Sequence, residues 1–123
     1  MKDKLEPNMY VRTKWGYICK IININDFREP NMKYGVEASY LKDIMFIGDD
    51  DILKARHKII NILEVGDYVN GYPIYEIIEY EDNTRAIVIG DDNKSIIWEE
   101  SSQYIKSVIT HELMEQMAYK VGE

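Results

Sequence analysis

Leu63-Glu64-Val65-Gly66-Asp67-Tyr68-Val69-Asn70-Gly71-Tyr72 is the stretch of this 123-residue chain that decides the fold. Gly66-Asp67 and Asn70-Gly71 are turn dipeptides, because glycine adopts positive φ freely and Asp or Asn can hydrogen-bond the neighbouring backbone. Tyr68 and Val69 lie between the dipeptides and favour an extended, half-buried backbone. The stretch therefore predicts sharp turns between strands of a β-rich protein.

Short apolar runs rich in β-branched and aromatic residues continue on both sides of this stretch, separated by Gly, Asp, Asn or Pro. They predict strands at residues 10–13, 17–24, 34–40, 44–47, 73–80, 85–89, 95–98 and 105–109. Residues 52–57 are predicted to form a helical turn capped by Asp51, followed by a strand or an irregular apolar stretch. Thr110 is expected to cap a short helix over residues 111–117, and residues 119–121 can form a last edge strand.

Length and composition fit one compact domain, or two very small units that share a core. Apolar residues make up 46% of the chain, which argues against disorder. Residues 1–8 are predicted as a flexible extension, residues 9–62 as an N-terminal β-rich unit, and residues 63–123 as a C-terminal β-meander with a short helix. The predicted fold class is mainly β with short helices, built as two small SH3-like strand-rich units packed together.

A weak internal repeat supports two units, although the alignment needs gaps. The recurring segments are Tyr10-Val11 with Tyr68-Val69, Gly16-Tyr17 with Gly71-Tyr72, Ile21-Ile22 with Ile77-Ile78, and Ile47-Gly48-Asp49-Asp50 with Ile89-Gly90-Asp91-Asp92. Turn residues and isoleucine also recur by chance in any β-rich chain, so a single domain stays an alternative.

The charge balance points toward basic partners. The chain holds 22 acidic and 15 basic residues, a formal net charge of -7. Nucleic-acid binding depends on counterion release by clustered Lys and Arg, so direct binding of DNA or RNA is not expected. An acidic surface instead favours basic protein surfaces, including the grooves in which enzymes hold nucleic acid. Negative charge that merely keeps the protein dissolved is the simpler alternative.

The sequence predicts a cytosolic protein without a membrane partner. No segment approaches the ~20 apolar residues of a membrane span, and the first residues lack the apolar core of a secretion signal. The single cysteine, Cys19, lies in an apolar run and is interpreted as a small buried hydrophobe.

No catalytic or cofactor motif stands out, so we predict that the chain is not an enzyme and holds no cofactor or metal. His57 and His111 lack metal-ligand spacing and are interpreted as surface residues. Gly48-Asp49-Asp50 and Gly90-Asp91-Asp92 resemble carboxylate turns that hold Mg²⁺, but no phosphate-clamping basic cluster accompanies them. They are interpreted as solvated turns, and a hydrolase or nuclease built on them is the least favoured alternative.

Aromatic residues add a second recognition signal, with ten Tyr and two Trp in the chain. Tyrosine supplies a large contact area with few rotors to immobilise, which suits binding surfaces, although strands also favour tyrosine for packing. Together with the acids at predicted turns, these rings define the candidate partner-binding residues Asp49, Asp50, Asp51, Asp91, Asp92, Glu99, Glu100, Tyr72 and Tyr75.

Three segments carry a family resemblance: Tyr10-Val11-Arg12-Thr13-Lys14, the run from Ile59 to Gly71, and Ile105-Lys106-Ser107-Val108-Ile109-Thr110 with the helix after it. In combination they are similar to small phage- and prophage-encoded proteins of Firmicutes, of the clostridial type, which carry an LIEVGDYVNG-like motif. The helix in that group has a Lys-Glu-Gln-Phe type sequence, whereas this chain has His111-Glu112-Leu113-Met114. The resemblance implies a phage origin and the cytoplasm of a bacterial host, and it transfers no functional residue.

Two functions follow from these expectations. In the first, the chain is a phage accessory protein that inhibits a bacterial defence protein, of the anti-CRISPR or anti-restriction type, by placing its acidic surface in a basic nucleic-acid-binding groove. In the second, it is a structural, assembly or adaptor module of a phage without inhibitory activity. Convergence of the candidate acids on one face would favour the first.

Overall fold

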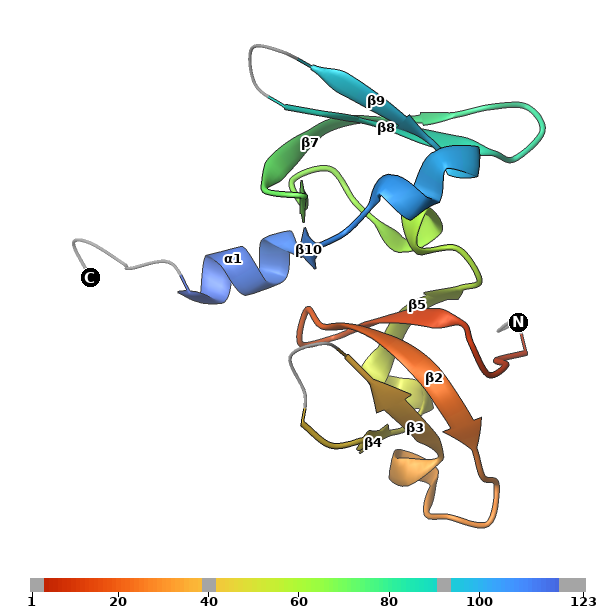
Figure 1. Cartoon of the computed structure of the whole chain (residues 1–123). Helices are drawn as coiled ribbons and strands as arrows, with labels where there is room; N and C mark the ends of the chain where they lie inside the picture. Colours follow the sequence, from red (N-terminus) through yellow and green to blue (C-terminus); the bar gives the residue numbers. More distant parts are fainter. Residues whose placement is uncertain (1–3, 39–41, 91–93, 118–123) are drawn as a thin grey trace. The chain divides into compact units, whose positions relative to one another are not determined.

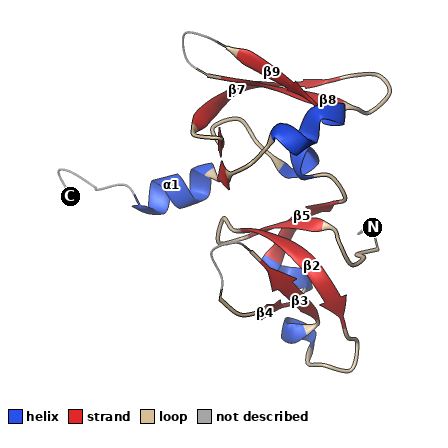
Figure 2. Ribbon diagram, viewed as in Figure 1, coloured by secondary structure: helices blue, strands red, loops and turns tan. Residues whose placement is uncertain are grey.

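The computed structural model describes residues 4–38, 42–90 and 94–117 of the chain (Figure 1). The protein is mainly β, as predicted: it contains two antiparallel five-stranded sheets and a few short helices, shown in red and blue in Figure 2. The chain divides into two compact units, Met1–Ile62 and Leu63–Glu123, here called the N-terminal unit and the C-terminal unit. Each unit contains one of the sheets.

The N-terminal unit is a meander whose last strand returns to pair with the first. Its strands are β1 (Tyr10–Thr13), β2 (Ile18–Ile24), β3 (Tyr34–Glu37), β4 (Met45–Ile47) and β5 (Ile52–Arg56). Its 3-10 helices are η1 (Pro30–Met32), η2 (Asp49–Asp51) and η3 (Ile59–Ile62). The strand order is β4-β3-β2-β1-β5, and every pairing is antiparallel.

The C-terminal unit repeats this order with different strand lengths. Its elements are β6 (Tyr68–Val69), β7 (Tyr72–Glu79), β8 (Arg85–Ile89), β9 (Ser95–Trp98), η4 (Glu99–Tyr104), β10 (Val108–Ile109) and α1 (His111–Met117). The order β10-β6-β7-β8-β9 again pairs the first strand with both the second and the fifth. In both units a 3-10 helix also precedes the fifth strand. This is the strand order of an SH3-like fold, and it occurs twice.

The predicted central turns are confirmed. Asn70 and Gly71 have φ of 53° and 86°, and they connect Val69 to Tyr72, which face each other across the β6–β7 ladder. Two residues with positive φ between paired strands form a type I′ hairpin, for which Asn-Gly is the preferred sequence. The Asn70 side chain also accepts hydrogen bonds from the backbone N–H groups of Lys106 and Ser107, at 2.7 and 3.1 Å. The hairpin therefore anchors the chain that enters β10.

The core of the N-terminal unit is formed mainly by side chains of its strands. The buried apolar side chains are Met9, Val11, Cys19, Ile21, Tyr34, Val36, Ile47 and Ala55. Cys19 is thus a buried hydrophobe, as expected. Within the predicted N-terminal extension, Leu5 packs against this core and the Asn8 N–H donates to the Ile21 carbonyl at 2.7 Å.

The C-terminal unit has its own set of buried apolar side chains: Leu63, Val69, Ile74, Ala86, Ile87, Ile89 and Ile97. They come from β6 to β9 and from the residue where the unit begins. Arg85 of β8 secures that first residue, since its Nη1 donates to the Leu63 carbonyl at 2.9 Å while its Nη2 contacts Glu79 at 2.8 Å.

One element differs from the prediction in type. The predicted helical turn at residues 52–57 is wrong, because Ile52–Arg56 forms β5 and pairs with β1, Val11 facing Ala55. The sequence of residues 52–56 is compatible with a helix or a strand, and pairing with a strand about 40 residues away determines that it forms a strand. Asp51 caps the turn before the strand instead: its Oδ2 accepts from the Gly48 N–H at 3.0 Å, which closes η2.

Two further predictions need correction. The strand expected at residues 105–109 is only Val108–Ile109, because η4 and its exit occupy the preceding residues. The proposed equivalence of Ile47-Gly48 and Ile89-Gly90 is wrong, since the first pair ends a fourth strand and the second ends a third strand. The strand predicted at residues 119–121 lies outside the described residues.

The carboxylate of Asp51 makes the stability of the N-terminal unit depend on pH. The hydrogen bond from Gly48, opposed by partial burial and assisted by Lys14 at 3.0 Å, holds the pKa of Asp51 below its ordinary value. A depressed pKa adds stability above the unfolded-state value and loses it as the pH falls through the folded-state value. Asp51→Asn should therefore cost about 1 kcal/mol at pH 7 and much less near pH 3.

Urea denaturation at the two pH values measures this difference. Asp50→Asn is the matched control, because Asp50 is an exposed acid in the same turn, and its small effect should not change with pH. An Asp51→Asn penalty of equal size at pH 3 and pH 7 would contradict the assignment.

Candidate functional site

The acidic character of the chain belongs to one of its two units. The N-terminal unit holds 11 basic and 9 acidic residues, whereas the C-terminal unit holds 4 basic and 13 acidic residues. Formal charges of +2 and -9 therefore make up the net charge of -7. Such asymmetry between halves indicates that association with a basic partner would be directed by the C-terminal unit.

The candidate acids are distributed over both units. Asp49 and Asp50 are exposed in η2, and Asp51 beside them is half-buried by its contacts with Gly48 and Lys14. Asp49 is engaged as well, since the Tyr34 hydroxyl donates to it at 2.7 Å. In the C-terminal unit Glu99 is half-buried and Glu100 is exposed at the start of η4. The remaining two candidates, Asp91 and Asp92, lie outside the described residues.

The candidate tyrosines stand on β7. Tyr72 is 55% exposed and Tyr75 is 45% exposed. Tyr75 lies where the β7–β8 register shifts, between Ile74 and Glu76, so its ring leaves the regular alternation of the strand. Lys94 Nζ lies 4.8 Å from the centre of the Tyr75 ring, which is cation–π distance.

The same sheet carries an apolar surface of which the sequence reasoning had considered only Tyr80. Across the three strands, Ala86 of β8 pairs with both Ile78 of β7 and Trp98 of β9. Two residues further along β8, Val88 pairs with Ile96 of β9. These five side chains therefore lie on one side of the sheet. The Tyr80 ring stacks on Trp98 with the ring centres 5.9 Å apart. We call the side chains of Ile78, Tyr80, Val88, Ile96 and Trp98 the aromatic face.

Three side chains of the aromatic face are exposed to solvent. Tyr80, Ile96 and Trp98 are 39%, 47% and 43% exposed. Glu76, whose strand partner is Val88, belongs to the same side of the sheet, and the acids of η4 follow Trp98 directly. Large exposed apolar side chains rimmed by charge are typical of protein interaction sites.

A groove of about 710 Å³ lies along β5 in the N-terminal unit. Its charged lining is mixed, with Lys33, Lys54 and Arg56 beside Asp26 and Asp49. Lys33 contacts Asp26 at 3.1 Å, and this hydrogen bond raises the pKa of Lys33. Because its lining contains both cations and acids, the charge of the groove favours neither an anion nor a cation.

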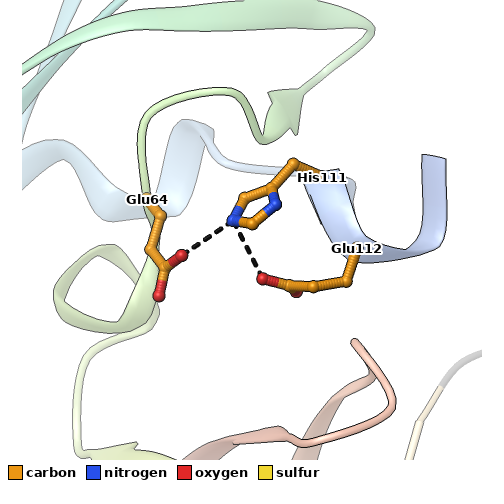
Figure 3. A group of neighbouring side chains, drawn as sticks. All are labelled: Glu64, His111 and Glu112. Atoms are coloured by element: carbon orange, nitrogen blue, oxygen red, sulfur yellow. Dashed lines mark hydrogen bonds and ion pairs between the residues drawn. The ribbon is translucent and has the colours of Figure 1, made fainter. Parts of the chain in front are cut away.

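A separate polar cluster forms where the beginning of the C-terminal unit meets α1. Figure 3 shows Glu64, His111 and Glu112 pointing toward one another. His111 Nε2 lies 2.8 Å from Glu64 Oε1 and 2.9 Å from Glu112 Oε1. All three side chains are partly buried, and one ligand atom from each lies within 4.8 Å of the others.

The buried carboxylate of Asp67 holds this cluster together. Its Oδ2 accepts from the Glu64 N–H at 2.7 Å, and its Oδ1 accepts from the His111 N–H at 2.9 Å. Asp67 is 0% exposed, so these charge-assisted bonds form away from water. Thr110, also 0% exposed, accepts from the Leu113 N–H at 3.3 Å and starts α1 as predicted.

The cluster combines donors that can bind either a proton or a divalent cation. An imidazole nitrogen and two carboxylates are ligands of zinc and related metals. Sequence spacing hid this arrangement, because Glu64 and His111 are 47 positions apart. The adjacent pair His111-Glu112 and the turn at Gly66-Asp67 were visible separately, and only the fold connects them.

Comparisons with protein-family models, with curated proteins and with solved structures found no match. Among the described residues, no helix is both long and apolar enough to cross a membrane.

Replacement of Asp67 by Asn tests its central role. The amide keeps one acceptor oxygen but turns an NH₂ group toward a buried N–H donor, which loses a charge-assisted bond and leaves that donor unpaired. We expect a loss of about 3 kcal/mol in the free energy of unfolding, together with faster hydrogen exchange at the amides of Glu64 and His111.

Asp82→Asn provides the comparison, because Asp82 also accepts two hydrogen bonds, from the Thr84 backbone and hydroxyl, but in an exposed turn. Its effect should stay below about 1 kcal/mol. Equal losses of unfolding free energy in the two variants would contradict the central role of Asp67.

Proposed function

We propose that this chain is a phage-encoded accessory protein that binds and inhibits a bacterial defence protein, such as a CRISPR effector or a restriction enzyme. The charge of -9 on the C-terminal unit is the observation that carries the proposal. Its acidic surface would occupy the basic groove in which the target holds nucleic acid. The partner chemistry is therefore a strongly basic protein surface rather than DNA, RNA or lipid.

The aromatic face would supply the apolar contacts that slow dissociation, which charge alone does not. Electrostatic attraction mainly accelerates encounter and weakens with salt, whereas desolvated aromatic side chains slow dissociation. Trp98 and Tyr80 already stack on each other, so little side-chain freedom is lost when a partner covers them. The exposed acids Glu76 and Glu100 belong to the same strands or follow them directly, which places steering charge next to the apolar contact.

The phage assembly or adaptor module is the second candidate. The duplicated SH3-like order supports it, because small SH3-like modules commonly bind other proteins without catalysis. The two functions differ in their partners. An inhibitor competes with nucleic acid for a host protein, while an assembly module binds phage proteins and is indifferent to nucleic acid.

Affinity capture with the tagged full chain separates them. Bacterial host lysate is applied at low and moderate salt, bound proteins are identified by mass spectrometry, and elution by double-stranded DNA is compared with elution by buffer. We expect a host nuclease whose recovery falls with salt and which DNA displaces. Recovery of phage proteins alone, or of nothing, would reject inhibition.

Charge reversal then locates the surface. Glu76→Lys combined with Glu100→Lys should weaken binding of the captured protein roughly tenfold at low salt, and less at high salt. Glu29→Lys with Glu37→Lys is the matched control, since both are exposed acids of the N-terminal unit and the net charge changes equally. Equal weakening by both pairs would show that only total charge matters.

A third pair of reversals covers the candidate acids of η2. Asp49→Lys with Asp50→Lys changes two exposed side chains of the N-terminal unit by the same four charge units. Because the acidic excess lies in the other unit, we expect these variants to bind as tightly as the unmodified chain. A tenfold loss here would transfer the binding surface to the N-terminal unit.

A further inference from the structure

We infer that Glu64, His111 and Glu112 form a binding site for a divalent transition metal, with Zn²⁺ the ion that suits the ligands best. This site is independent of the proposed function, because it uses neither the aromatic face nor the exposed acids beside it. It lies wholly within the C-terminal unit, on the turn before β6 and the first residues of α1.

The hydrogen bonding of His111 is the first argument. Two carboxylate oxygens, from Glu64 and Glu112, approach the same Nε2 at 2.8 and 2.9 Å (Figure 3). That nitrogen carries at most one proton, so the two oxygens must share a single N–H. A metal ion bound to Nε2 in place of the proton would accept electron density from all three ligand atoms at once.

The distances allow such an ion. Zinc bonds to imidazole nitrogen and carboxylate oxygen are about 2.0–2.2 Å long, which places tetrahedral ligand atoms roughly 3.4 Å apart. The three candidate atoms already lie within 4.8 Å of one another, and the two contacts to Nε2 need only lengthen slightly. Small rotations of the two glutamate side chains complete the geometry, since both side chains remain partly exposed.

The charge also favours a cation. A neutral imidazole with two carboxylates carries two negative charges, which one divalent ion neutralises. The surrounding unit has a formal charge of -9, so its long-range field adds to the local attraction. Imidazole nitrogen selects zinc, nickel or copper over magnesium and calcium, which prefer oxygen ligands alone.

Hydrogen bonds already fix the backbone of two of the three ligands. Asp67 ties the N–H groups of Glu64 and His111 to one buried carboxylate. Gly66, with φ of 97°, lies so close to His111 that a Cβ on it would be 3.5 Å from the His111 Cβ. Ligands held by such supporting contacts lose little freedom when the metal binds.

Metal binding to the full chain is measured by isothermal titration with ZnCl₂ after chelator treatment, and by visible absorption with Co²⁺ as a spectroscopic probe. We expect one Zn²⁺ per chain, Co²⁺ bands typical of nitrogen and oxygen ligation, and a rise of several degrees in the melting temperature at saturating Zn²⁺. Mg²⁺ at the same concentration should produce no shift.

Variants assign the site. His111→Ala should abolish the stoichiometric binding and the Co²⁺ bands. The isosteric pair Glu64→Gln and Glu112→Gln should weaken binding at least tenfold each, while circular dichroism shows the fold retained. His57→Ala is the matched control, because His57 also contacts one carboxylate, that of Glu6 at 3.0 Å, and no second carboxylate of the described residues forms an ion pair with it. Zinc binding by His57→Ala should equal that of the unmodified chain.

Three results would overturn the inference. They are the absence of stoichiometric binding, binding that survives both glutamine substitutions in folded protein, and binding that His57→Ala removes as completely as His111→Ala.

Discussion

The buried carboxylate of Asp67 is the interaction on which the C-terminal unit depends. It accepts hydrogen bonds from two backbone N–H groups, those of Glu64 and His111, that are far apart in the sequence. A charge with no exposure to water is tolerated because both bonds are charge-assisted and replace its hydration. One side chain therefore sets where the unit begins, where β6 starts and where α1 emerges. The Glu64, His111 and Glu112 cluster follows from these three constraints.

The same strand order is closed differently in the two units. In the N-terminal unit the fifth strand, β5, is five residues long and pairs with all of β1, with one register shift between Arg12 and Thr13. In the C-terminal unit β10 has only two residues, so backbone pairing contributes less. Side-chain hydrogen bonds compensate for the short ladder. Asn70 accepts one from the Lys106 N–H before β10, and Asp67 accepts one from the His111 N–H after it. Polar side chains thus hold the C-terminal fold where the N-terminal fold relies on strand pairing.

Local signals were sufficient for most of the fold. The Asn70-Gly71 turn, the strand after it and the helix after Thr110 were all predictable, because positive φ, alternation and capping depend on adjacent residues. The strand at Ile52–Arg56 was not, since only its pairing with β1 distinguishes it from a helix. The polar cluster and the aromatic face were not predicted from the sequence for the same reason. Their members come from separate elements, and only the fold places Trp98 on the same side of the sheet as Ile78 or His111 beside Glu64.

The proposed partner surface and the proposed metal site use different parts of the C-terminal unit. The aromatic face is built on β7, β8 and β9, whose geometry depends on ladder register and on apolar side chains such as Ile87. The polar cluster is built on a turn and a seven-residue helix, whose geometry depends on Asp67 and Thr110. A bound divalent ion would leave the unit strongly acidic, since it offsets two of nine net negative charges. The proposed metal binding and the proposed partner binding would therefore be separable, because a metal ion at the polar cluster would not neutralise the acidic surface.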